Sequence, residues 1–137
     1  YMALEAFRAA EMLAEQGVSA EVIDVRSLRP WDKTTVMASV SKTGRVIVTD
    51  TSWAAVGFSA EVVACIAEQG LSLRTFPQRV CLPDNPTPTS AALAAHYYPR
   101  AVDLATTAAS MVGVPFSVPS GEDIPLDVPD MSFTGPF

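Results

Sequence analysis

The sequence of this 137-residue chain offers few residues whose type and spacing could support acid–base, nucleophilic or metal chemistry. His96 is the single histidine and lies near the end of an expected helix. A catalytic histidine needs a carboxylate to orient it, or a hydroxyl or thiol to activate, and the sequence identifies no such partner nearby. We therefore interpret His96 as a helix-end or interface residue, with a catalytic role as the alternative.

The loop at 50–57 is the second candidate, because it follows an expected strand and precedes an expected helix. Ligands of α/β folds bind at such turns. The loop has a single glycine, Gly57, and lacks the glycine-rich pattern of a phosphate or dinucleotide site. We favour an interface loop over a ligand loop, with Trp53 as its aromatic anchor. The candidate interface residues are Trp53, Phe58, Asp84, Phe133 and Phe137, and no catalytic, cofactor-binding or metal residue is predicted.

The net charge and the cysteines argue against binding to nucleic acid or anionic lipid and against a disulfide bond. The net charge is −6, which argues against nucleic acid or anionic lipid as a partner. Cys65 falls in a helical pattern and Cys81 in a strand-like pattern, so we interpret both as buried apolar residues rather than a disulfide. Arg26 and Arg29 could pair with carboxylates of this domain or of a neighbouring subunit, and we favour the pair within the domain.

Helical and strand-like segments alternate along the chain, and this order positions the candidates. The alternation predicts an α/β fold, with a mostly parallel sheet between two helical layers. We expect helices at 1–16, 32–42, 57–69, 90–97 and 99–112, and extended segments at 20–26, 45–49, 73–76 and 78–82. Asp32 is placed to cap the second helix, Gly44 to end it, and Gly113 to end the last.

The first expected helix begins without a capping residue and without the strand that normally precedes it. We therefore expect the first strand of the fold to be missing just upstream of Tyr1. The folded domain is expected to cover 1–113. Residues 114–137 contain five prolines and contribute −4 of the net charge, so we expect an irregular acidic segment. Its apolar residues favour an extended arm over a partner or over its own domain, with a disordered terminus as the alternative.

Five motifs, in the same order as in a known family, cover about residues 1–112. They resemble the C-terminal domain of the transketolase-like superfamily, most closely that of the beta subunits of thiamine-dependent 2-oxoacid dehydrogenases of the pyruvate, branched-chain and acetoin types. That domain opens with a strand leading into its first helix. The motifs are Glu-Val-Ile-Asp-Val-Arg-Ser-Leu-Arg-Pro-Trp-Asp at 21–32, Ser-Lys-Thr-Gly-Arg-Val-Ile-Val at 41–48, Gly-Phe-Ser-Ala-Glu-Val-Val at 57–63, Arg-Val-Cys-Leu-Pro-Asp-Asn-Pro-Thr-Pro at 79–88 and Tyr-Pro-Arg-Ala-Val-Asp at 98–103.

The resemblance implies an assembly role within a larger enzyme that decarboxylates a 2-oxoacid and passes the acyl group to lipoamide. Thiamine diphosphate and Mg²⁺ would bind outside this chain, which alone would be inactive. Its partners would be an alpha subunit, a second beta subunit and the peripheral subunit-binding domain of the acyltransferase core. The alternatives are a non-catalytic interaction module of the same fold, or the C-terminal domain of a transketolase or deoxyxylulose phosphate synthase. The alanine-rich composition favours a bacterial cytoplasm over a mitochondrial matrix.

Overall fold

The computed structural model of the chain describes residues 1–94 and 96–118. Its elements in chain order are α1 Met2–Glu15, α2 Lys33–Thr43, β1 Ile47–Trp53, α3 Phe58–Glu68, β2 Gln78–Leu82, α4 Ala91–Ala94 and α5 Ala101–Val112. The predicted helices are confirmed with shifts of a few residues at their ends. The expected helix at 90–97 is shortened to α4. The predictions for residues 119–137 lie outside the described residues.

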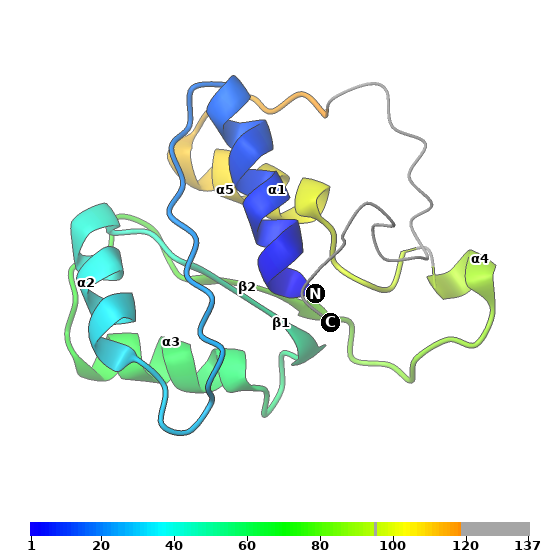
Figure 1. The fold of residues 1–137 in the computed structure, drawn as a ribbon, viewed down its shortest axis with the longest axis horizontal. Coiled ribbons are helices and arrows are strands. Elements are labelled where there is room, and N and C mark those ends of the chain that lie inside the picture. The colour runs from blue at the N-terminus through cyan, green and yellow to red at the C-terminus, as the bar shows by residue number, and fades with distance from the viewer. Residues whose placement is uncertain (95, 119–137) are drawn as a thin grey trace.

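Three layers make up the described part of the chain, as predicted. β1 and β2 pair in parallel, with Ile47 opposite Gln78 and Thr49 opposite Val80. α1 and α5 pack together on one side of the strands, and α2 and α3 lie on the other (Figure 1). A parallel pair of strands has to be covered on both faces, and the two helical layers provide this cover.

The prediction of a strand at 20–26 is wrong. This segment is extended but belongs to no sheet, because β1 pairs only with β2 among the described residues. Alternating apolar residues predict an extended segment with one face toward the core and the other toward solvent. A strand also needs a hydrogen-bonded neighbour. The extended piece at 73–76 is likewise not a strand. β1, in contrast, continues to Trp53, beyond the predicted end at 49.

Two apolar clusters form the interior, one on each side of the strands. The first joins α1 and α5 through Leu13, Ala105 and Ala109, each almost wholly buried. The second joins α2 and α3 through Val40 and Ile66. A fully buried leucine or isoleucine contributes about 1.5–3 kcal/mol, so these contacts dominate the stability of each layer. The alanines of the first cluster let α1 and α5 approach closely.

A buried carboxylate ties α1 to the start of α5. Glu5 is 1 % exposed, and its Oε2 accepts a hydrogen bond from the Ala101 backbone N–H at 2.7 Å. The guanidinium of Arg100 lies 3.5 Å from the same oxygen, and that of Arg8 lies 3.8 Å from Oε1. The negative charge sits at the positive end of the α5 dipole, which stabilises it. Nearby, the Tyr1 hydroxyl donates to the Pro99 carbonyl (3.2 Å), and burial raises the pKa of Tyr1.

Asp32 caps α2 as predicted. Its carboxylate accepts hydrogen bonds from the Thr35 backbone N–H (3.0 Å) and from the Thr35 hydroxyl (2.6 Å). These bonds hold the pKa of Asp32 below its ordinary value. Gly44 and Gly113 end α2 and α5 in the left-handed conformation, with φ of 67° and 74°.

We expect Asp32→Ala to lower the midpoint of thermal unfolding at pH 7. The capping bonds favour the ionised carboxylate, so their stabilisation is present above the pKa of unfolded aspartate and disappears as the pH falls below about 4. The difference between the wild type and Asp32→Ala should therefore shrink in acid. Asp32→Asn keeps an acceptor without the charge, so it should retain most of the stability at pH 7. An unfolding midpoint of Asp32→Ala equal to that of the wild type at pH 7 would contradict this account.

We expect Glu5→Gln to reduce the free energy of unfolding by about 2–3 kcal/mol, because it leaves two guanidinium groups facing a neutral amide in a buried site. Urea unfolding followed by circular dichroism measures this change. Glu11→Gln is the matched control, since Glu11 is an exposed glutamate of the same helix and its change should stay within about 0.5 kcal/mol. Equal effects of the two substitutions would show that the Glu5 cluster does not hold α1 to α5.

Candidate functional site at the carboxyl edge of the sheet

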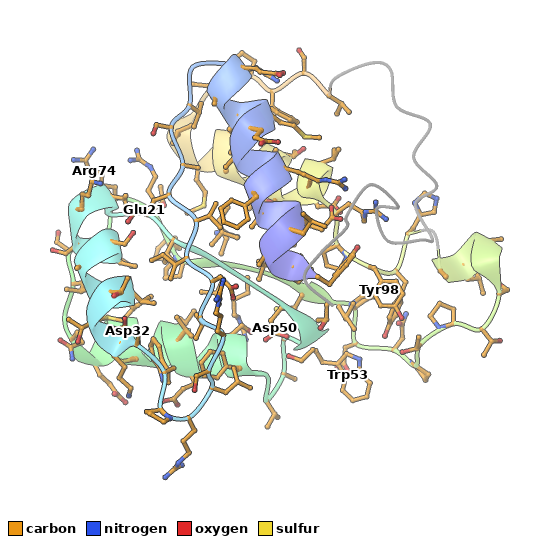
Figure 2. All side chains as sticks on the ribbon, viewed as in Figure 1. Glu21, Asp32, Asp50, Trp53, Arg74 and Tyr98 are labelled. Atoms are coloured by element: carbon orange, nitrogen blue, oxygen red, sulfur yellow. The ribbon has the colours of Figure 1, made fainter. Side chains whose placement is uncertain are left out.

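The carboxyl ends of β1 and β2 meet at one edge, where Trp53 stands opposite Leu82. From here the chain turns through residues 54–57 into α3. Figure 2 shows Asp50 and Trp53 together at this end of β1. Open α/β sheets bind their ligands at this position, so the edge is the first place to test for chemistry.

Asp50 already occupies the start of α3. Its Oδ2 accepts a hydrogen bond from the Ser59 backbone N–H (3.2 Å), and its Oδ1 accepts one from the Ser52 N–H. The amino end of a helix attracts anions because its first N–H groups lack partners within the helix. Here the chain supplies that anion itself, so this first-turn N–H is not available to an external phosphate.

Ser59 and Cys81 are two nucleophilic groups that lie together near this edge. The Ser59 hydroxyl lies 3.3 Å from the Cys81 sulfur, and Ser59 is wholly buried. A nucleophile requires a base to take its proton, and the neighbouring carboxylate, Asp50, already accepts two backbone hydrogen bonds. The contact joins α3 to β2 and has the character of core packing. Both cysteines are free, as predicted.

The loop after β1 is folded tightly against its own backbone and against β2. A side chain at Gly57 would collide with the Trp53 carbonyl and the Ser52 hydroxyl, which accounts for the glycine. Val56 has a φ of 61°, which is rare for a β-branched residue, and its side chain is fully exposed. The Arg79 guanidinium donates to the Ala54 carbonyl at 2.5 Å and holds the loop against β2. The backbone conformation of the loop therefore directs the apolar side chain of Val56 into solvent.

The predicted interface residues divide between this edge and the core. Trp53 is 47 % exposed at the end of β1, and the exposed Asp84 follows β2 at the same edge. Phe58 is half-buried, and its ring meets that of Trp31 edge-on at 5.7 Å between centroids. The interface role of these three remains a prediction. Phe133 and Phe137 lie outside the described residues.

The remaining candidates lie apart from this edge. His96 is exposed, just after α4. The neighbouring Tyr97 is buried, and its hydroxyl donates to the Asn85 carbonyl (3.0 Å), which anchors the proline-rich turn after β2. No local pattern in the sequence signals this contact, because Tyr97 and Asn85 are 12 residues apart in the chain and α4 lies between them. Arg26 pairs with Asp24 at 3.1 Å, so the ion pair within the domain is confirmed for Arg26.

Two features were also sought within the described ranges 1–94 and 96–118: a metal-binding group of side chains and a membrane-spanning helix. No group of three or more histidine, cysteine, aspartate or glutamate side chains is placed to bind a metal ion. None of the described helices combines the length and the apolar character that crossing a bilayer requires.

Comparison with known proteins identifies the family of this α/β domain. Residues 1–104 match the family described as Transketolase, C-terminal domain. Over 100 aligned residues the chain is 40 % identical to the pyruvate dehydrogenase E1 component subunit beta-1, mitochondrial, of Arabidopsis thaliana. The aligned stretch is 72 % of this chain and 28 % of that subunit. The pyruvate dehydrogenase E1 component subunit beta of Bacillus subtilis is 44 % identical over 92 residues, 66 % of this chain and 28 % of the subunit.

A relative of a different name matches over a similar length. The beta subunit of acetoin:2,6-dichlorophenolindophenol oxidoreductase from Cupriavidus necator is 36 % identical over 108 residues, 78 % of this chain and 32 % of that subunit. The chain therefore spans about a third or less of the relatives it matches, which include mitochondrial and bacterial proteins. On this evidence, the chain belongs to the transketolase C-terminal domain family.

Proposed function

We propose that this chain is the C-terminal assembly domain of the beta subunit of a 2-oxoacid dehydrogenase. In the proposed enzyme, a 2-oxoacid is decarboxylated on thiamine diphosphate and the acyl group passes to lipoamide. The observation that carries this proposal is the identity of 36–44 % to beta subunits of pyruvate dehydrogenase and of the acetoin oxidoreductase, over most of the chain. The domain contributes contacts between subunits rather than reacting groups.

The carboxyl edge of the sheet supports a role in assembly. Trp53 and Val56 are exposed apolar residues close together in the sequence. The loop that carries them is held by the close backbone approach at Gly57 and by the hydrogen bond from Arg79, so they form a rigid apolar projection. Rigid aromatic residues are the commonest anchors of protein interfaces. The partners in this proposal are an alpha subunit, a second beta subunit and the peripheral subunit-binding domain of an acyltransferase.

The residues of the carboxyl edge do not fit thiamine diphosphate and Mg²⁺. The diphosphate needs unpaired N–H groups or cations, whereas the start of α3 is already capped by the Asp50 carboxylate. A second anion there would face that negative charge directly. We therefore place the cofactor on other parts of the assembly, and no step of the reaction is assigned to this chain.

We expect isothermal titration of the chain with thiamine diphosphate and Mg²⁺ to give no heat of binding, because the edge that could accept a phosphate is closed by Asp50. Asp50→Ala would free the Ser59 N–H and provides a comparison. Saturable binding to the unmodified chain, lost on substitution of its own side chains, would overturn the proposal that the cofactor is held elsewhere.

We also expect Trp53→Asp to disrupt assembly. The experiment replaces the aligned segment of the Bacillus subtilis beta subunit with this chain and measures its association with the alpha subunit by light scattering after size-exclusion chromatography. Trp53→Asp should weaken association by about tenfold or more, since anchor residues contribute about 2 kcal/mol or more to an interface.

Phe76→Asp is the matched control for this experiment. Phe76 is also an exposed aromatic residue, 87 % exposed, but it precedes β2 and so lies at the opposite edge of the sheet. It should leave association unchanged. If both substitutions weaken association equally, or neither does, the carboxyl edge is not the assembly surface.

A further inference from the structure

A groove of about 910 Å³ lies between α5 and the segment that leads from α3 into β2. Residues between 71 and 78 line one wall of the groove, and residues between 106 and 111 of α5 line the other. Leu71, Leu73 and Met111 are half-buried, whereas Phe76 is 87 % exposed. The groove therefore combines partly covered aliphatic side chains with an aromatic ring that faces solvent.

The groove carries a positive charge that the described part of the chain does not neutralise. Of the described residues that line it, only Arg74 is charged, and this side chain is exposed. No carboxylate of residues 1–94 or 96–118 lies within ion-pair distance of its guanidinium, whereas Arg26 and Lys33 each have such a partner. Glu21, beside the last turn of α2, pairs with Lys42 at 3.5 Å. The free positive charge of Arg74 contrasts with the net charge of −6 of the chain.

Backbone contacts hold both walls of the groove in place. The Arg74 N–H donates to the Gly44 carbonyl at 2.7 Å, which fixes Arg74 at the C-terminal end of α2, where Figure 2 shows it. On the other wall, the Arg45 guanidinium donates to the Met111 carbonyl at 3.0 Å. A groove that is formed before binding spares its occupant the cost of ordering it.

The chemistry of the groove selects an acidic and apolar polypeptide segment. A guanidinium binds a carboxylate through charge-assisted hydrogen bonds. Grooves with aromatic side chains bind extended segments that contain proline, because such segments lose little conformational freedom on binding. The preferred occupant therefore has carboxylates, aliphatic side chains and prolines close together.

The chain itself contains a segment of this composition. The sequence at 122–130 is Glu-Asp-Ile-Pro-Leu-Asp-Val-Pro-Asp, and residues 114–137 include no lysine or arginine. This segment lies outside the described residues. Ser117, close to where the description ends, exchanges two hydrogen bonds with the Gln16 side chain, at 2.9 and 3.1 Å. From that point, residues 119–137 can span about 60 Å, and a domain of this size is about 35 Å across. The groove is thus within reach of the segment.

We propose that the groove is a docking site for residues 122–130 of the same chain. A carboxylate of the segment binds the Arg74 guanidinium, and its aliphatic residues pack against Phe76 and Leu73. A single exposed ion pair contributes little stability. Attachment to the same chain gives the segment an effective concentration in the millimolar range, so weak contacts suffice to fill the groove. The same segment of a second copy, or an acidic segment of another protein, is the competing occupant.

The test replaces Leu126 of the full chain, and in a second sample Ile124, with the photoreactive residue p-benzoylphenylalanine. Mass spectrometry after irradiation identifies the residues that become cross-linked. We expect cross-links within one chain to residues 71–78 or 106–111. Arg74→Glu should lower their yield about fivefold or more, because it replaces attraction by repulsion. Arg29→Glu is the matched control, since Arg29 is also exposed but does not line the groove, and it should leave the yield unchanged.

A second variant removes the charge from the other partner and leaves residues 1–118 as they are. Conversion of the four carboxylates of residues 122–130 to amides should lower the yield as Arg74→Glu does. An unchanged yield in either charge variant, or no cross-link to the groove from either position, would overturn the proposal. Cross-links to the groove that join two chains would overturn it as well, because the occupant would then come from a second copy.

Discussion

The parallel pairing of β1 with β2 is the interaction on which the rest of the structure depends, because it joins two cores that otherwise have little in common. Side chains of a strand alternate between faces. Ile47 and Val80 therefore pack against the cluster of α1 and α5, while Val46 and Val48 pack against that of α2 and α3. Loss of this pairing would leave two separate helix pairs, each with one apolar face exposed.

The same pairing fixes the carboxyl edge of the sheet. It brings Trp53 beside Leu82 and lets the Arg79 side chain reach the loop after β1. Asp50 then connects the end of β1 to the start of α3 and takes the position that an external anion would need. At this edge, where other α/β proteins bind a ligand, the first-turn N–H of Ser59 is satisfied internally, and the apolar side chains of Trp53 and Val56 are exposed. These features support the assembly role that we propose.

Local patterns predicted the elements whose causes are local. The order of helices, the Asp32 cap, the left-handed Gly44 and Gly113 and the unpaired cysteines all follow from neighbouring residues. The prediction of a strand at 20–26 was wrong because a strand forms only beside a hydrogen-bonded neighbour, and the periodicity of apolar residues does not show whether that neighbour is present. The pairing of Glu5 with Ala101, and that of Asp50 with Ser59, escaped the sequence analysis for a related reason. Each joins elements whose contact is set by the tertiary fold.

We propose that this domain joins subunits and leaves cofactor chemistry to other parts of the assembly. An experimental structure of the natural beta subunit with its alpha subunit, thiamine diphosphate and Mg²⁺ tests it most directly. The account predicts Trp53 and Val56 buried at a subunit boundary, with the Asp50 carboxylate still bound to the Ser59 N–H. A diphosphate held at the start of α3, with Asp50 displaced and Trp53 in solvent, would contradict it.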